Sequence, residues 1–202
     1  MYYLVDTNVF LHVIDSNIYG VAKWCKDNGK DITITQTILD ELDPGYYREN
    51  EDESSKEIYT AVKNYVSGAM GIKIIKLVSL ADIHGAEEEY KKIRKRFYSW
   101  MRDAKYLQNL ISRGELTPEE IKKPSFKTKD MGECELIAIA KASEGKYWVV
   151  TNDKGRVYKH PNLNIFDTYA DDDAVTIISG EDLLNTIGDL NDTLIDQNSK
   201  IN

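Results

Sequence analysis

A short apolar run at the start of the chain ends abruptly in a carboxylate and two small polar side chains. Residues 2–5 read Tyr-Tyr-Leu-Val, and Asp6, Thr7 and Asn8 follow them directly. A run of strand-forming residues without polar alternation is typical of a strand buried on both faces of a parallel sheet. Ligands of such sheets bind outside the carboxyl ends of the strands, so the sequence places Asp6 where a metal ion can be held.

Alternating strand and helix patterns indicate the fold class. Further strands are predicted at 32–34, 73–78, 147–151 and 175–178, with helical segments between them. This alternation predicts a three-layer α/β/α fold with a mostly parallel, roughly five-stranded sheet.

The helices are predicted from apolar residues that recur every three or four positions. The first predicted helix covers 9–27 and has a break near 15–17. Shorter helices are predicted at 36–42, around 58–66, at 117–120 and at 132–142. One long helix is predicted over 83–111 with Asp82 as its cap, and a last helix follows Ser179, which caps it. The predicted loops are an acidic one at 46–57, a basic one at 123–129 and another at 162–173. Residues 189–202 form a polar tail that we expect to be disordered.

Composition excludes several classes of protein and site. The start of the chain lacks the basic and apolar regions of a signal peptide, and no apolar stretch approaches membrane-spanning length, so we expect a cytoplasmic protein without a membrane partner. Cys25 and Cys134 belong to no CxxC pattern, and the three His residues are scattered. A disulfide framework or a zinc site is therefore not expected, and no local signature supports a Ser/His/Asp or Cys/His catalytic group.

Four carboxylates are expected to meet at one edge of the predicted sheet. Asp6 follows the first strand, Glu41 lies in the helix after the second, and Glu133 and Asp153 lie on either side of the fourth. Carboxylates brought together raise one another's pKa unless a cation compensates them. An oxygen-only ligand set favours Mg²⁺ or Mn²⁺ over zinc, so the pattern predicts a site for one of these ions.

At these residues the sequence resembles the PIN domain, a family of metal-dependent nucleases that includes the VapC-type toxins. YYLVDTNVFL is similar to the family's opening strand, ILDEL to the segment with the second acid, GECELIAIAKA to the helix with the third, and WVVTND to the strand before the fourth. The resemblance implies metal-site and catalytic roles for Asp6, Glu41, Glu133 and Asp153, with Asn8 and Thr151 as supporting residues. It favours Glu41 over Asp40 and Asp153 over Asn152, and leaves Asp130 as a supporting residue or a helix cap.

The resemblance covers roughly residues 1–187, which predicts a single domain over 1–188. Compact PIN domains lack a counterpart of about 97–129, so this helical and basic stretch is predicted to be an insertion. The implied activity is hydrolysis of RNA phosphodiester bonds by an endoribonuclease, in which divalent ions activate the attacking water and stabilise the leaving oxygen. The resemblance is compatible with two biological roles, a toxin bound by a small antitoxin or an RNA-processing enzyme. By the same resemblance, a protein partner would dock around 55–70, and the protein could form a homodimer.

The net charge of −8 is unfavourable for binding RNA unless the basic residues gather on one face. Such a face is predicted from Lys91, Lys92, Arg94, Lys95 and Arg96, possible RNA contacts that compete with the more usual interpretation of a solvated helix surface. Tyr98 and Trp100 beside them are candidate stacking surfaces for bases.

Two alternatives to the nuclease remain open. A PIN-type fold can keep its acids and act as a non-catalytic module that binds RNA or protein. A metal-dependent phosphatase fits less well, because phosphatases of the haloacid dehalogenase type have a second Asp where this chain has Asn8. A phosphoacceptor receiver also fits poorly, because residues 79–81 after the third predicted strand contain no acid.

Overall fold

A parallel five-stranded sheet forms the centre of the protein, as the sequence predicts. The computed structural model describes residues 1–14, 17–44, 53–69, 71–160 and 162–188. Its strands are β1 (Tyr2–Val5), β2 (Asp31–Ile34), β3 (Ile75–Leu77), β4 (Tyr147–Val150) and β5 (Thr176–Ile178). They lie in the order β3-β2-β1-β4-β5, and every neighbouring pair is parallel. The strand order reverses between β1 and β4, and such a switch point is where ligands bind in open α/β sheets.

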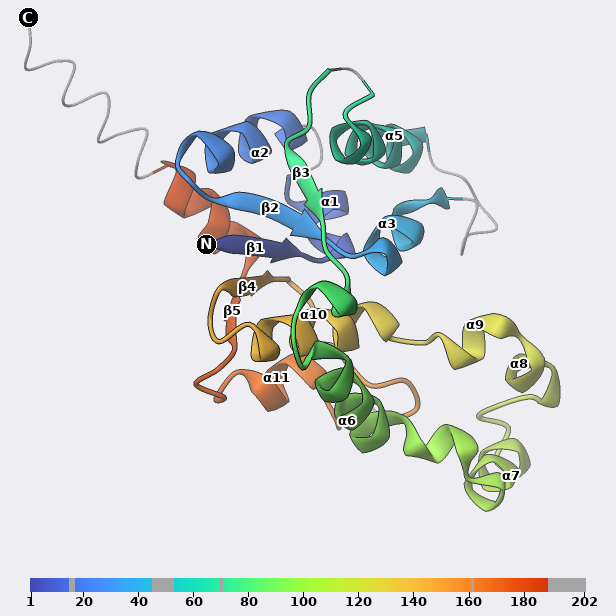
Figure 1. Cartoon of the computed structure of the whole chain (residues 1–202). Helices are drawn as coiled ribbons and strands as arrows, with labels where there is room; N and C mark the ends of the chain where they lie inside the picture. Colours follow the sequence, from blue (N-terminus) through green and yellow to red (C-terminus); the bar gives the residue numbers. More distant parts are fainter. Residues whose placement is uncertain (15–16, 45–52, 70, 161, 189–202) are drawn as a thin grey trace, which may run out of the picture.

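One helical layer is built from the segments that connect the first three strands (Figure 1). It contains α1 (Thr7–His12), α2 (Ile18–Asp27), α3 (Gln36–Leu42) and α5 (Glu53–Ser67). The predicted helix over 9–27 is divided as expected, although residues 15–16 of the break lie outside the described part. The predicted loop at 46–57 is wrong at its end, because α5 begins at Glu53 and buries Ile58 and Val62, one helical turn apart. Residues 45–52 of that loop are outside the described ranges.

The opposite layer consists of α6 (Ala86–Tyr98), α10 (Met131–Ala142) and α11 (Ile165–Tyr169) (Figure 1). Helix α10 packs against α6 and β4, and residues 136–140 are fully buried. A helix that is apolar on all sides is typical of a position between a sheet and another helix. The predicted loop at 162–173 is wrong over its central part, because α11 lies within it and buries Ile165 and Phe166. The three-layer α/β/α architecture is as predicted.

The single long helix predicted over 83–111 is divided in the structure. A 3₁₀ turn, η2 (Leu80–Asp82), precedes α6, and a second, η3 (Ser99–Arg102), separates α6 from α7 (Ala104–Ser112). Asp82 does not cap the long helix but forms a capping box with Ser79 around η2. Asp103 caps α7, because its carboxylate accepts hydrogen bonds from two backbone N–H groups of that helix.

Helices α7, α8 (Pro118–Lys122) and α9 (Pro124–Lys127) form an extension beside the sheet with a small core of its own (Figure 1). Leu110, Leu116 and Phe126 are buried in this core, and Trp100 packs against them. The basic loop predicted at 123–129 is wrong because α9 lies within it. The extension falls within the stretch that the sequence predicts as an insertion.

The last described segment, residues 180–188, is helical, and Ser179 caps it as predicted by accepting a hydrogen bond from the N–H of Asp182. The predicted polar tail at 189–202 lies outside the described residues. Within the described ranges, no helix is both long and apolar enough to cross a membrane.

The stability of the extension can be tested at Leu110, whose side chain is fully buried. We expect Leu110→Ala to lower the free energy of unfolding by about 3 kcal/mol, because the lost methyl groups leave a cavity in a small core. Leu77→Ala is the control, since Leu77 is 46% exposed, and its effect should stay within about 0.5 kcal/mol. Urea denaturation measures both; equal effects would contradict the second core.

Candidate functional site

The centre of the candidate site is Asp6, whose side chain is only 5% exposed at the end of β1. The backbone N–H of Thr7 donates to its Oδ1 at 2.7 Å. The side-chain amide of Asn8 and the hydroxyl of Thr151 both donate to its Oδ2, at 2.5 and 2.7 Å. Charged acceptors form the stronger hydrogen bonds in proteins, so these donors offset part of the cost of burying the carboxylate.

Asn8 and Thr151 connect the ends of β1 and β4 through this carboxylate. The amide of Asn8 also donates to the hydroxyl oxygen of Thr151 at 3.2 Å, and its Oδ1 accepts the backbone N–H of Asn152 at 3.1 Å. The turn after β4 is therefore held in register with the turn after β1. Of the three side chains predicted to support the site, Asn8 and Thr151 contact Asp6 directly.

Glu41 reaches the same edge from α3. The hydroxyl of Thr7 donates to its Oε2 at 2.9 Å. On its other side lies the first turn of α10: a Cβ atom added to Gly132 would lie 3.0 Å from Oε1 of Glu41 and 3.0 Å from Cδ1 of Ile38. The absence of a side chain at Gly132 thus lets the carboxylate of Glu41 approach the helix.

Glu133 and Asp130 come from the start of α10. Asp130 occupies the N-cap position with φ 53°, but its side chain does not cap the helix. Its Oδ2 instead accepts hydrogen bonds from the hydroxyl of Tyr98 in α6 and from the backbone N–H of Tyr158. Asp130 therefore joins α6 and the segment after β4 to the helix that carries Glu133.

Asp153 follows β4 by three residues. Its backbone N–H donates to the hydroxyl of Thr151 at 3.0 Å, and its Oδ1 accepts the N–H of Gly155 at 3.1 Å. Its charge raises the pKa of Asp6, which places the two carboxylates within electrostatic range of one another.

The carboxylates of the site form one electrostatic network. Burial raises the pKa of Asp6 from 3.8 to about 6, although its hydrogen-bond donors lower it. The pKa of Glu41 is raised from 4.5 to about 7, first by burial and then by the charges of Asp6, Glu135 and Asp130, although the hydroxyl of Thr7 lowers it. The pKa of Glu133 lies well above its ordinary value, because of burial first and then the charges of Asp6, Asp130 and Glu41.

No positive side chain compensates this network in the described part of the chain. Neither Lys nor Arg forms an ion pair with Asp6, Glu41, Glu133 or Asp153 among the described residues. Buried carboxylates without a compensating cation are costly, and structures keep them mainly where they have a function.

The donor chemistry fits a hard divalent cation, since all four side chains offer carboxylate oxygens. As these side chains lie, however, the described ranges contain no group of three His, Cys, Asp or Glu residues close enough to hold one ion. Like charges separate in the absence of a cation, and a divalent ion lowers the free energy of drawing them together. Asp6, held by three donors, is the fixed member of the set.

The basic residues predicted as RNA contacts divide between two sides of α6. Lys92 pairs with Glu89 at 2.6 Å, and the guanidinium of Arg96 lies over the rings of Phe97 and Tyr169. Lys91, Arg94 and Lys95 face a pocket on the side of α8 and α9. The prediction thus combined residues that face different surroundings.

The predicted stacking surface at Tyr98 is wrong. Tyr98 is 4% exposed and lies beneath the guanidinium of Arg94, whose central carbon is 4.1 Å from its ring centroid. Trp100 packs among the aromatic rings of the extension, 6.1 Å from Phe126 and 5.3 Å from His160 between centroids, but it is only partly buried. The stacking role of Trp100 stays a prediction.

Three residues contribute to the site in roles that were not predicted from the sequence: Thr7, Gly132 and Tyr98. The signals for the first two were visible, since Thr7 lies between two selected residues and Gly132 directly precedes a selected acid. Tyr98 had no comparable signal, because its contact with Asp130 depends on how α6 and α10 pack.

Comparison of the chain with protein-family models and with curated proteins found no match. What remains as evidence of function is the geometry and electrostatics of the acidic edge, which consists of Asp6, Glu41, Glu133 and Asp153.

The raised pKa of Glu41 predicts how stability depends on pH without metal. In the folded state the carboxyl group of Glu41 stays protonated up to about pH 7, whereas in the unfolded chain it loses its proton near pH 4.5. The contribution of Glu41 to the free energy of unfolding therefore falls as the pH rises between these two values. Glu41→Gln removes this loss of stability at high pH, because Gln does not titrate. The side-chain oxygen of Gln can still accept a hydrogen bond from the hydroxyl of Thr7. We expect the variant to be about 2 kcal/mol more stable than the wild type at pH 8 and nearly equal at pH 4.5, by urea denaturation in EDTA. A variant less stable than the wild type at pH 8 would contradict the electrostatic network.

Proposed function

We propose that this protein is a metal-dependent endoribonuclease of the PIN type, which hydrolyses phosphodiester bonds in RNA. The observation that carries the proposal is the acidic edge at the switch point of the sheet. Asp6 is buried, Glu41 and Glu133 are partly buried, and Asp153 is exposed. The charges of neighbouring carboxylates raise the pKa of the first three, and none of the four has a cationic partner among the described residues. A divalent cation is the simplest group that would compensate them.

The cation, Mg²⁺ or Mn²⁺, would be held by Asp6, Glu41, Glu133 and Asp153. When bound, such an ion supplies Lewis-acid activation of water and of the phosphodiester oxygens at neutral pH. The acids act as ligands in this proposal and not as nucleophiles.

The other residues of the site position these ligands. Asn8 and Thr151 hold both the rotamer of Asp6 and the spacing between the turns after β1 and β4. Thr7 orients Glu41 through its hydroxyl. Such supporting hydrogen bonds reduce the reorganisation needed when the ion and substrate arrive.

A non-catalytic module that binds RNA or protein is the main alternative. The cost of keeping the buried Asp6 close to Glu41 and Glu133, which are partly buried, argues for metal chemistry, because a binding surface alone does not need it. A phosphatase has less support, since Asn8 uses its amide to fix Asp6 and offers no second acid after β1.

The proposal is tested by cleavage of labelled single-stranded RNA in Mn²⁺, Mg²⁺ or EDTA. We expect cleavage with either ion and none in EDTA. Asp6→Asn and Asp153→Asn should each lower the rate at least about 100-fold, because each removes a carboxylate ligand. Asp171→Asn, which removes an exposed acid away from the site, is the matched control and should keep wild-type activity.

Calorimetric titration with Mn²⁺ separates the remaining outcomes. Metal binding that is weakened in Asp6→Asn and Asp153→Asn, without cleavage of any RNA, would favour the non-catalytic module. A wild-type protein that binds no Mn²⁺ would refute the proposed metal site.

Gly132 gives a test of the site that leaves its carboxylates in place. Gly132→Ala adds a methyl group in close contact with the carboxylate of Glu41, which can move, and with Ile38, which is fully buried. We expect a loss of stability of about 1 kcal/mol from the contact with Ile38 and about tenfold weaker binding of Mn²⁺, because Glu41 is displaced. Gly188→Ala is the control, since no atom lies within 4 Å of the added methyl. Unchanged Mn²⁺ affinity in Gly132→Ala would exclude Glu41 as a ligand.

A further inference from the structure

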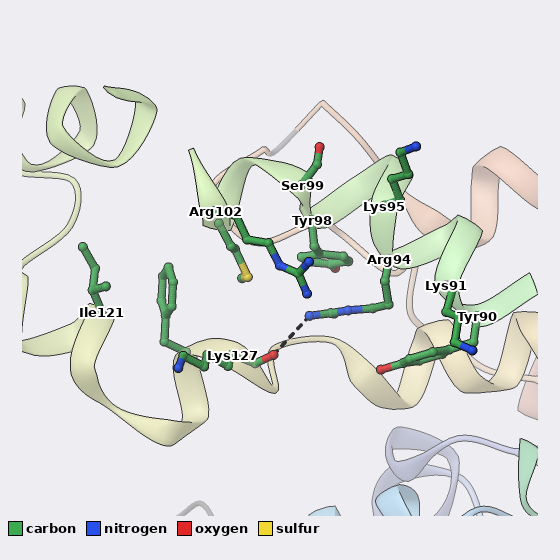
Figure 2. A pocket seen from close by; sticks show the side chains of 11 residues that line it. Tyr90, Lys91, Arg94, Lys95, Tyr98, Ser99, Arg102, Ile121 and Lys127 are labelled. Carbon is green, nitrogen blue, oxygen red and sulfur yellow. Dashed lines mark hydrogen bonds between the residues drawn. The ribbon is translucent and has the colours of Figure 1, made fainter. Parts of the chain in front are cut away.

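A pocket of about 760 Å³ lies between α6 and the extension. Tyr90, Met101, Ile121 and Phe126 contribute apolar surface to it, and basic side chains project from α6, η3 and α9 (Figure 2). The cavity exists because the extension folds back beside α6 instead of continuing it. Its volume lies within the range of ligand-binding pockets.

The charge of this pocket is opposite to that of the chain. Its basic lining residues are Lys91, Arg94, Lys95, Arg102 and Lys127, and none of the described residues that line it is Asp or Glu. The whole chain has a net charge of −8, so this concentration of positive charge is local. Cations that line a cleft of low dielectric constant raise the concentration of anions there.

Two guanidinium groups converge inside the pocket. Figure 2 shows the side chains of Arg94 and Arg102 directed toward one another. Arg94 is anchored from behind, because it donates to the backbone oxygens of Lys129 and Lys127 at 2.6 and 3.1 Å and lies over the ring of Tyr98. Neither guanidinium forms an ion pair with a carboxylate of the described residues. Two guanidinium groups that lie close together repel one another, and an anion bound between them would offset this repulsion.

The pocket is connected to the acidic edge through the chain segment before α10. Arg94 binds the carbonyl groups of Lys127 and Lys129, and Tyr98 of α6 donates to Asp130. The next turn of the chain carries Glu133. A ligand that extends out of the pocket along this segment would therefore pass toward the acidic edge.

We propose that this pocket binds the phosphodiester backbone of a single-stranded nucleic acid, with Arg94 and Arg102 on a phosphate and the apolar wall against the adjoining nucleoside. The inference rests on the proposed function, under which that strand is the RNA substrate and the pocket sets where it is cut. Lys95 and Lys91 at the rim add attraction to neighbouring phosphates.

A single strand fits the observations better than the other polyanions. A rigid duplex presents its phosphates on a wide convex surface and cannot insert one into a concave pocket, whereas an unpaired strand can. The carboxylates of an acidic peptide would be repelled by the carboxylates of the acidic edge. The phosphodiester oxygens of a nucleic acid are themselves ligands for the divalent ions proposed at the acidic edge.

The test compares two double variants that remove the same charge from exposed side chains of the same region. Lys95→Gln/Arg102→Gln alters the pocket, and Lys92→Gln/Arg96→Gln alters the other side of α6. Binding of a fluorescein-labelled oligouridylate of about 12 nucleotides, a length near the site sizes of single-strand binding proteins, is measured by anisotropy in EDTA, where no cleavage is expected. We expect about tenfold weaker binding for the pocket variant, a salt dependence lower by about 1.4 in slope, and less than twofold change for the control.

Several outcomes would overturn the pocket assignment. These are equal loss in both variants, no loss in the pocket variant, or equally tight pocket-dependent binding of polyglutamate or of a duplex of the same length. Circular dichroism melts exclude unfolding as the cause of any loss.

Cleavage in Mn²⁺ separates this inference from the proposed function. If the wild type cleaves RNA and the pocket variant has an unchanged KM, the binding of substrate in the pocket is refuted, whereas the proposed nuclease activity is supported. Pocket-dependent binding of the oligouridylate by a wild type that never cleaves would refute the nuclease and leave the binding site standing. Equal binding of oligouridylate and oligothymidylate would assign recognition to the phosphodiester and not to the sugar.

Discussion

The burial of the Asp6 carboxylate is the constraint on which the rest of the site depends. Taking such a group out of water costs several kcal/mol, and hydrogen-bond donors must offset the cost. The donors come from the turn after β1 and from the end of β4, so the two central strands cannot separate at this edge without leaving the carboxylate unpaired. One side chain thereby couples the register of the sheet to the geometry of the site, at the point where the strand order reverses.

The sheet could be predicted because β1 and β4 are continuous apolar runs that end in polar residues, and the other strands are rich in branched apolar residues. Periodicity was a weaker guide for the helices. The apolar stripe through 83–111 continues past the end of α6, but Ile93 and Phe97 pack in the main core while Leu110 packs in the core of the extension. An apolar stripe along a helix predicts which positions are buried, but it does not predict which part of the protein packs against them. Asp103, a favourable cap inside the stripe, was the local signal that the helix ends there.

The site was predictable to the extent that topology alone determines it. Parallel strands bring their carboxyl ends to one edge, so acids after β1 and β4 had to lie near one another. The contacts that hold them depend on tertiary packing. The approach of Glu41 to Gly132 requires α3 and α10 to meet at one turn, and the hydrogen bond from Tyr98 to Asp130 requires α6 to end beside α10. No spacing in the sequence encodes either distance. The same holds for the pocket, which exists only because the extension returns to α6.

Under the proposed function, the acidic edge and the basic pocket also explain how a chain of net charge −8 could act on a polyanion. Charges farther away than a Debye length, about 8 Å at physiological salt, are largely screened, so an approaching phosphate responds to the groups beside it and hardly to the sum. Under the proposed function, the pocket attracts the strand while the carboxylates repel it until a cation neutralises them. Binding of metal and of nucleic acid are then linked, and the linkage is reciprocal: whatever factor the ion adds to the affinity for the strand, the strand adds to the affinity for the ion. The ion is therefore expected to bind most tightly when the substrate is already in the pocket.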